Sequence, residues 1–404
     1  MNVKKFQYIY CIFLYGIIFF PGLLMVLFGS IGSNYLGIIT TSILIIILSL
    51  ALGINKLSIT DELLFLVFLV IVFLIIHFIF TFFLFDNEIN VQNIKSILSL
   101  ISLIIIVFAS FFVITSINEL DDDYFVKIIN KIFYTLILLG IFISLKIALG
   151  YQESKSMIFF TEPSHYALIT SVFFSYKIRM DKRNIFYAIP LLIIALLIEN
   201  LTLIVGVFLS ITFIFIRIRY LISILLFIIV LYSVLAGVSD SDKFNYYTQR
   251  IDISTQSSNT STLTLISGYE QILLSIYDTF GIGYGLQKMG YLNPRGEIAD
   301  IINSLRGGYS DSNLHDGGLF LSKIIVEFGF FGVIFFAFTL SLIKRFYYNE
   351  DKKIMFFCSV LYISIIYFLM RGSGYFTPSS ILLFLSLLFL TQNKILSSIS
   401  KYRK

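Results

Sequence analysis

Runs of about 18 or more apolar residues recur along this chain of 404 residues, and they limit its possible folds more than any other feature. Hydrophobic residues make up 58% of the sequence and charged residues 13%, too few to cover a water-soluble protein of this size. A transmembrane barrel would instead show short segments of alternating polarity. We therefore expect an all-α polytopic integral membrane protein, with residues 1–404 forming a single membrane domain.

The apolar runs predict twelve transmembrane helices, since each run is about long enough to cross a bilayer. The spans are expected at residues 7–28, 35–53, 63–85, 97–117, 132–150, 158–176, 185–199, 202–216, 220–238, 317–343, 354–370 and 378–393. Only Glu199, Asn200 and Leu201 separate the seventh span from the eighth. This spacing is consistent with a tight hairpin or with one broken helix.

The distribution of basic residues predicts the orientation of the chain. With the N-terminus in the cytoplasm, 19 of the 29 Lys and Arg residues fall on the inner side. The short outer loops then carry only Lys95, Lys155 and Arg371. This asymmetry follows the positive-inside rule and places both termini in the cytoplasm. The polar stretch 239–316, before the tenth span, becomes one large extracytoplasmic loop.

This large loop has mixed charge, with nine Asp and Glu residues against five Lys and Arg residues. We therefore expect no general electrostatic trap for anions, and an anion site would need individual arginines. The segment TLTLISGYEQILLSIYDTF is consistent with an amphipathic helix lying on the bundle. Its apolar residues at helical spacing are Leu265, Ile266, Tyr269, Leu273 and Ile276. The GIGYG that follows fits a flexible turn better than a phosphate cradle, because no strand precedes it.

Ionisable residues stand at the ends of two of these runs. FFTEPSHYALIT places Glu162 and His165 at the mouth of the sixth span, where Pro163 predicts the first turn of a helix. The alternative to a chemical role is that Glu162 only caps that helix. Lys323 and Glu327 stand four residues apart on the tenth span and share a helical face. They either form a structural ion pair or face a wet cavity.

Arg371 lies in MRGSGYFTPSS, between the last two spans, with a glycine directly after it. It either anchors the chain at the membrane interface or contacts a bulky partner. The three histidines of the chain do not have the spacing of a metal site. No Walker-type motif occurs, and no cytoplasmic segment is long enough for a nucleotide-binding domain. We expect no metal, no cofactor and no nucleic-acid partner.

The order of these motifs resembles that of the Wzy-type polysaccharide polymerases, which are grouped with the O-antigen ligases. TEPSH precedes an apolar span, a long outer loop carries Arg250, GIGYG follows, and His315 leads into VEFGFFG. The likeness covers roughly residues 150–335. It implies a multi-pass glycosyltransferase of the bacterial cytoplasmic membrane, with an outward-facing active site. Such enzymes polymerise undecaprenyl-diphosphate-linked oligosaccharide repeat units into O-antigen or capsular polysaccharide.

The resemblance also implies residue roles and partners. Glu162 and His315 are the expected catalytic residues, and Arg250 and Arg306 match arginines that bind the diphosphate of the lipid carrier. Four further ionisable residues of the expected outer face are candidates for substrate binding: His165, Arg371, Lys323 and Glu327. Besides the lipid-linked oligosaccharides and membrane lipid, a chain-length regulator and a flippase are expected partners.

Two alternative functions stay open at this point. The first is an O-antigen ligase, which transfers glycan to another acceptor, because likeness of fold does not separate the two enzymes. The second is a lipid-linked glycan transporter or flippase, for which twelve spans are common. Transporters usually contain repeats and interrupted helices near the middle of the membrane. This chain instead concentrates its polar residues in one outer loop.

Overall fold

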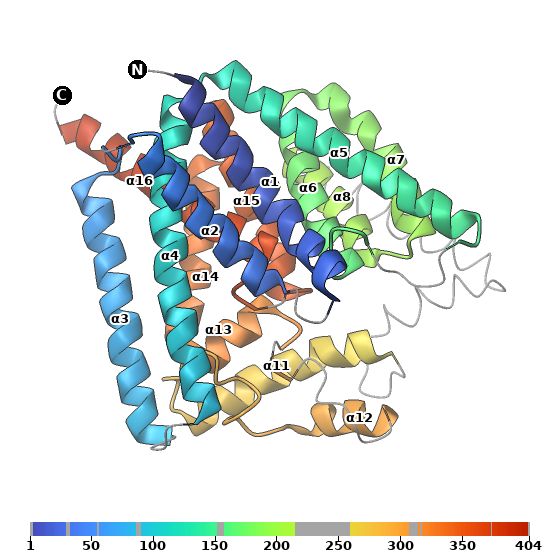
Figure 1. The fold of residues 1–404 in the computed structure, drawn as a ribbon. Coiled ribbons are helices and arrows are strands. Elements are labelled where there is room, and N and C mark those ends of the chain that lie inside the picture. The colour runs from blue at the N-terminus through green and yellow to red at the C-terminus, as the bar shows by residue number, and fades with distance from the viewer. Residues whose placement is uncertain are drawn as a thin grey trace.

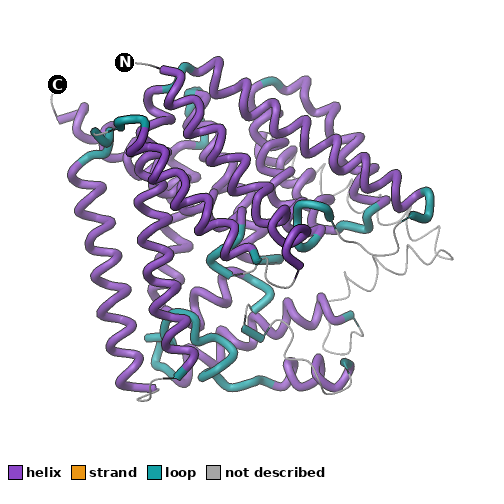
Figure 2. Tube along the Cα trace, in the orientation of Figure 1, coloured by secondary structure: helices purple, strands orange, loops and turns teal. Residues whose placement is uncertain are grey.

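The computed structural model describes residues 3–29, 33–54, 56–85, 90–151, 157–214, 259–306, 314–315, 317–372 and 374–402. The regular secondary structure of these ranges is helical (Figures 1 and 2). Met157 and Phe160 also form one isolated bridge. Seven of the described helices are long and apolar enough to cross a membrane. The protein is therefore an all-α, multi-pass membrane protein, as predicted. The expected ninth span and Arg250 lie outside the described residues.

The seven long apolar helices are α1 (Val3–Phe28), α2 (Asn34–Ala51), α3 (Asp61–Phe85), α4 (Val91–Glu119), α5 (Asp122–Ala148), α15 (Lys352–Leu369) and α16 (Pro378–Tyr402). The other described helices are α6 (Pro163–Met180), the 3-10 helix η2 (Lys182–Tyr187), α7 (Ala188–Leu197), α8 (Leu201–Ile214), α11 (Thr260–Asp278), α12 (Glu297–Leu305), α13 (Phe320–Phe328) and α14 (Phe330–Phe346). Helices suit such apolar runs because every backbone polar group must be satisfied within lipid.

The bundle has a buried central helix and an exposed apolar edge. Every residue of α6 from Ser164 to Ile178 is buried, and α6 packs against α5, α8 and α15. Helix α3 is the opposite case, because only Leu63, Val67, His77 and Thr81 are buried among its residues. The TEPSH segment therefore begins the central helix of the protein rather than a peripheral one.

Two helices lie across the direction of the others at one end of the bundle. Helix α1 begins and helix α16 ends at the same end, whereas α11 and α12 lie at the opposite end (Figure 1). There α11 runs across the long axes of α3 and α4 (Figure 1). We call this end of the bundle the α11 end. Which side of a membrane it faces stays a prediction.

The seventh and eighth expected spans are two separate helices joined by a tight turn. Glu199, two residues after the end of α7, has left-handed backbone geometry with φ of 55°. Asn200 then caps α8, because its side-chain oxygen accepts a hydrogen bond from the Leu203 amide at 3.2 Å. The apolar run is therefore interrupted at Glu199 and Asn200.

The tenth expected span, 317–343, is wrong as a single helix. It consists of α13 and α14, which are separated by Gly329. Gly329 has φ of 59° and ψ of −133°, a backbone conformation that is open to glycine and strained for other residues. A continuous apolar run hides this break, because one glycine in VEFGFFG does not by itself end a helix.

The GIGYG segment is a fixed turn that is packed on this break. The Tyr284 amide donates to the Val326 carbonyl at 2.9 Å, and the Gly285 amide donates to the Glu327 carbonyl at 2.8 Å. A Cβ atom at Gly283 would lie 2.6 Å from the Glu327 carbonyl oxygen. The flexible turn expected here is therefore wrong, because main-chain contacts with α13 hold the segment in place.

The predicted helix in the large loop is confirmed as α11, but its orientation is inverted. The five apolar residues at helical spacing are not buried, and Tyr269 and Leu273 are exposed. The buried face consists of small and polar residues and one leucine: Thr262, Leu263, Thr264, Ser267, Gly268, Gln271 and Ser275. Helix α11 thus packs on α12 through Leu263, with Ile266 partly buried beside it, and on α13 through polar residues such as Ser275.

Candidate functional site

The TEPSH segment begins α6 as predicted, with Pro163 in the first turn. Glu162 precedes this turn with extended backbone geometry, and its side chain makes no capping hydrogen bond. Instead its carboxylate accepts a hydrogen bond from Arg371 Nη2 at 2.6 Å and one from Ser164 Oγ at 3.0 Å. The interpretation of Glu162 as a simple helix cap is therefore wrong.

Arg371 reaches Glu162 from the loop that follows α15. Its amide donates to the Ile366 carbonyl at 2.9 Å, which fixes the start of this loop on the last turn of α15. The next amide, of Gly372, donates to the Gly318 carbonyl at 3.0 Å. These main-chain bonds hold the Arg371 side chain over the start of α6, so Arg371 is more than a plain interfacial anchor.

The environment of Glu162 favours its charged form. Burial raises the pKa of this carboxyl, but the positive charges of Arg371 and His165 and the hydrogen bonds from Arg371 and Ser164 together lower it. The net direction is a pKa below the ordinary value for glutamate. Glu162 is therefore an anion at neutral pH, paired with a guanidinium group.

The ion pair lies in the wall of an open pocket with a volume of about 190 Å³. Five parts of the chain meet there: the start of α6, the turn between α7 and α8, the start of α11, the loop before α13 and the end of α15. The lining residues are Glu162, Pro163, Ser164, Glu199, Asn200, Leu201, Thr202, Ser261, Thr262, Thr264, Leu265, Gly318, Ile366, Met370 and Arg371. The pocket combines charged groups, hydroxyls and apolar surface, as binding sites for amphiphilic molecules do.

His165 lies beside this pocket, one residue beyond the lining residue Ser164. Its Nδ1 atom is 2.7 Å from Thr161 Oγ1, and the side chain is buried in the first turn of α6. The side-chain Nδ2 of Asn34 on α2 also donates to the hydroxyl of Thr161 at 3.5 Å. His165 thus supports the segment that carries Glu162 and is not itself among the lining residues.

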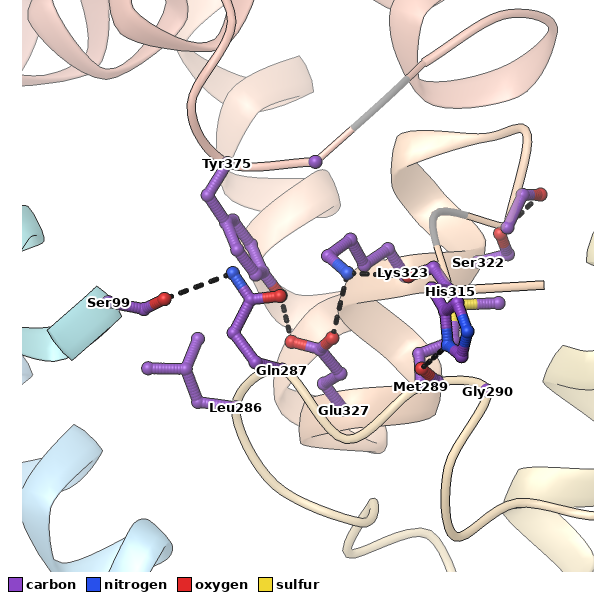
Figure 3. Close-up of polar contacts among 12 residues, drawn as sticks. Ser99, Leu286, Gln287, Met289, Gly290, His315, Ser322, Lys323, Glu327 and Tyr375 are labelled. Carbon is purple, nitrogen blue, oxygen red and sulfur yellow. Dashed lines mark hydrogen bonds and ion pairs between the residues drawn. The ribbon is translucent and has the colours of Figure 1, made fainter. Parts of the chain in front are cut away.

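A second polar cluster is buried on α13. Lys323 Nζ lies 3.1 Å from the Glu327 carboxylate, and the two side chains are 2% and 0% exposed (Figure 3). Tyr375 donates to the same carboxylate at 2.6 Å, and Lys323 Nζ donates to the carbonyl of His315 at 2.8 Å. The shared helical face is therefore confirmed, and the geometry is that of a buried structural ion pair.

His315 belongs to this second cluster and is absent from the lining of the pocket. Its ring stacks on Tyr291 with centroids 4.2 Å apart, and its Nδ1 lies 3.4 Å from the Met289 carbonyl oxygen. The structure thus does not bring the two predicted catalytic residues, Glu162 and His315, into one pocket wall. They are linked only indirectly, through the loops that precede α13 and follow α15.

Arg306 lies at the C-terminal end of α12, close to the start of α11. Its Nη2 donates to Thr260 Oγ1 at 3.4 Å, and the next residue, Ser261, lines the pocket. Arg306 is therefore near the pocket without being part of its described wall. Within the described ranges, no three His, Cys, Asp or Glu side chains are grouped as metal ligands would be.

Two polar residues of the site were missed in the sequence. Asn200 donates from its side chain to the Pro163 carbonyl at 2.7 Å and so joins the α7–α8 turn to the start of α6. Tyr375 ties the Arg371 loop to Glu327. The only signal for Asn200 was its place between two apolar runs, and Tyr375 had no signal beyond its proximity to Arg371.

Comparison of this chain with models of protein families, with curated proteins and with solved structures finds no match. The likeness to the Wzy-type polymerases therefore depends on the quoted motifs and on their order along the chain.

Proposed function

We propose that this protein is a membrane glycosyltransferase that polymerises undecaprenyl-diphosphate-linked oligosaccharide repeat units into O-antigen or capsular polysaccharide. The proposal includes a bacterial cytoplasmic membrane, cytoplasmic termini and a pocket that faces outward. The single observation that carries it is the Glu162–Arg371 ion pair, at 2.6 Å, in the wall of an open polar pocket. The pair involves TEPSH, the first motif of the resemblance.

The chemistry required of such an enzyme suits these two side chains. An acceptor hydroxyl oxygen attacks the anomeric carbon of the donor sugar, the bond from that carbon to the diphosphate oxygen breaks, and the lipid diphosphate leaves. The acceptor proton passes to a base. No ATP is needed, because the donor carries its own leaving group.

Arg371 suits the departing diphosphate, because a guanidinium group stays charged and binds phosphate oxygens through paired N–H groups. One N–H of Arg371 holds Glu162, and its remaining N–H groups can face a phosphate. A diphosphate bound to Arg371 would weaken the hold on Glu162, whose carboxylate could then accept the proton of the acceptor hydroxyl. A positioned carboxylate of this kind contributes about 10²–10⁴-fold to a rate.

The test is an assay of the purified protein in detergent with lipid-linked repeat units as the only substrate. We expect a ladder of longer lipid-linked glycans, resolved by gel electrophoresis and mass spectrometry. Transfer of the glycan only to an added lipid acceptor of another kind would identify a ligase instead. If no glycan is lengthened or transferred in detergent, where transport has no meaning, the enzyme proposal fails and a transporter becomes the better hypothesis.

A further inference from the structure

The C-terminal half of helix α11 exposes a row of apolar side chains. Tyr269, Leu273 and Tyr277 follow one another at intervals of four residues, and Phe280 lies two residues beyond the end of the helix. All four are exposed, Leu273 to 71% and Phe280 to 89%. We call these four residues the outward stripe. In water, a stripe of this kind would be an unfavourable surface.

The opposite side of α11 is already occupied by protein. Gln271 donates to the Arg295 carbonyl at 2.7 Å, and Ser275 donates to the Val326 carbonyl at 3.2 Å. On the stripe itself, the Tyr269 hydroxyl donates to the Leu369 carbonyl at 2.8 Å, which ties α11 to the end of α15. These hydrogen bonds fix the polar side of α11 toward the protein. The outward direction of Leu273 and Tyr277 is therefore set by the fold.

The outward stripe continues into the surface of the membrane-spanning helices. Phe280 is followed by Gly281, which packs on the Phe330 ring at the start of α14. Phe330 and Phe331 are both exposed, and the Phe331 ring lies 4.5 Å from that of Phe73 on α3. Helix α3 is the apolar helix with the least buried surface of the seven. An apolar surface thus extends from α3 through α14 to α11.

From this continuity we propose that the outward stripe of α11 lies in membrane lipid, among the acyl chains below the headgroups of the leaflet at the α11 end. Tyrosine and phenylalanine suit that depth, because their rings favour the boundary between headgroups and hydrocarbon. Helix α11 is then a membrane-embedded element that lies across the spans, and the segment expected as an extracytoplasmic loop lies partly in the bilayer.

If the proposed function holds, an embedded α11 would let a lipid-linked substrate reach the pocket from the membrane. The first turns of α11 supply Ser261, Thr262 and Thr264 to the pocket lining from the polar side of the helix. A lipid-linked substrate could place its diphosphate and sugars in the pocket while its hydrocarbon tail stays in lipid beside α11. No extraction of the tail from the membrane would be needed.

The test of the embedded helix uses spin labels and does not depend on catalysis. A single cysteine replaces Leu273 in a full-length variant whose native Cys11 and Cys358 are changed to alanine, and the labelled protein is reconstituted in lipid nanodiscs. Phe68→Cys on α3 is the lipid-facing reference, and Asp300→Cys on α12 is the water-facing reference. Collision with oxygen reports lipid, and collision with a soluble nickel chelate reports water.

We expect the label at Leu273 to collide with oxygen and to be shielded from nickel, as at Phe68. Two results would overturn the proposal: strong collision with nickel as at Asp300, or shielding from both reagents, which would show that protein covers the stripe. Tyr277→Cys is the second label position if Leu273→Cys does not fold. If the wild-type protein lengthens no glycan while the label at Leu273 lies in lipid, the proposed function fails and this inference stands.

Discussion

Arg371 Nη2 lies 2.6 Å from the carboxylate of Glu162, although the two residues are 209 positions apart in the sequence. The contact joins the loop after α15 to the start of the central helix α6. It also turns two isolated charges into one ion pair in the wall of a pocket. Substitutions can separate a chemical role of this pair from a structural role of the buried cluster on α13.

Replacing Arg371 with alanine should reduce polymerisation by about 10²–10³-fold, because a preorganised donor to the departing diphosphate is lost. Arg371→Lys should retain part of the rate, because the charge remains but the paired N–H geometry is lost. The measurement is the initial rate of glycan elongation by detergent-purified protein. Arg183→Ala is the matched control, because Arg183 pairs with Asp181 on an exposed surface. Equal losses in both alanine variants would contradict the assignment.

The protonation of Glu162 should respond to Arg371. In the wild type the pKa of this carboxyl is lowered, since the lowering by Arg371 and the other neighbours outweighs the raising by burial. In Arg371→Met the raising by burial should dominate, so the pKa should increase and the protonated form should persist to higher pH. Infrared difference spectroscopy of the carboxyl stretch across a pH series, with Glu162→Gln used to assign the band, measures this shift. An unchanged titration would show that Arg371 does not control the charge of Glu162.

Breaking the buried pair should cost stability whatever the function. Glu327→Gln leaves the charge of Lys323 buried without its partner, and we expect a loss of about 3–5 kcal/mol in the free energy of unfolding. The unfolding temperature in detergent ranks the wild type and the variants by stability.

The double variant Lys323→Met with Glu327→Leu distinguishes packing from chemistry, because an apolar replacement of both partners can be neutral for stability. If the pair is structural, this variant should regain both stability and polymerisation. If stability recovers but polymerisation does not, Lys323 and Glu327 would instead be substrate-binding residues.

The turn that packs on the helix break should be intolerant of a side chain. Gly283→Ala places a Cβ atom 2.6 Å from the Glu327 carbonyl oxygen at a backbone φ of 86°. Gly53→Ala is the matched control, since φ is 67° there and a Cβ would meet no atom within 4 Å. Both variants carry the strain of positive φ, so the larger drop in unfolding temperature expected for Gly283→Ala reports the close contact. Equal drops would show that the contact is unimportant.

The parts of the fold that depend on local signals were predictable from the sequence. Pro163 marks the first turn of α6, the interval of four residues between Lys323 and Glu327 places them on one face, and the apolar runs mark the long helices. Each of these signals acts within a few residues, where the geometry of a helix fixes the outcome.

The remainder depends on contacts between distant segments. Nothing near Glu162 indicates Arg371, and nothing near Glu327 indicates Tyr375. The inversion of α11 was hidden for another reason. The spacing of its apolar residues predicts a helix with one apolar and one polar side. The spacing does not determine whether the apolar side faces the protein or the lipid. Leu273 faces outward because the polar side of α11 found its partners within the protein.

The most direct measurement is elongation of lipid-linked repeat units by detergent-purified Glu162→Gln beside Glu297→Gln, a matched change at an exposed position on α12. We expect Glu297→Gln to build the wild-type ladder, whereas Glu162→Gln should fold normally but elongate about 10²–10⁴-fold more slowly. A ladder of wild-type length and rate from Glu162→Gln would contradict the claim that this carboxylate acts in the reaction.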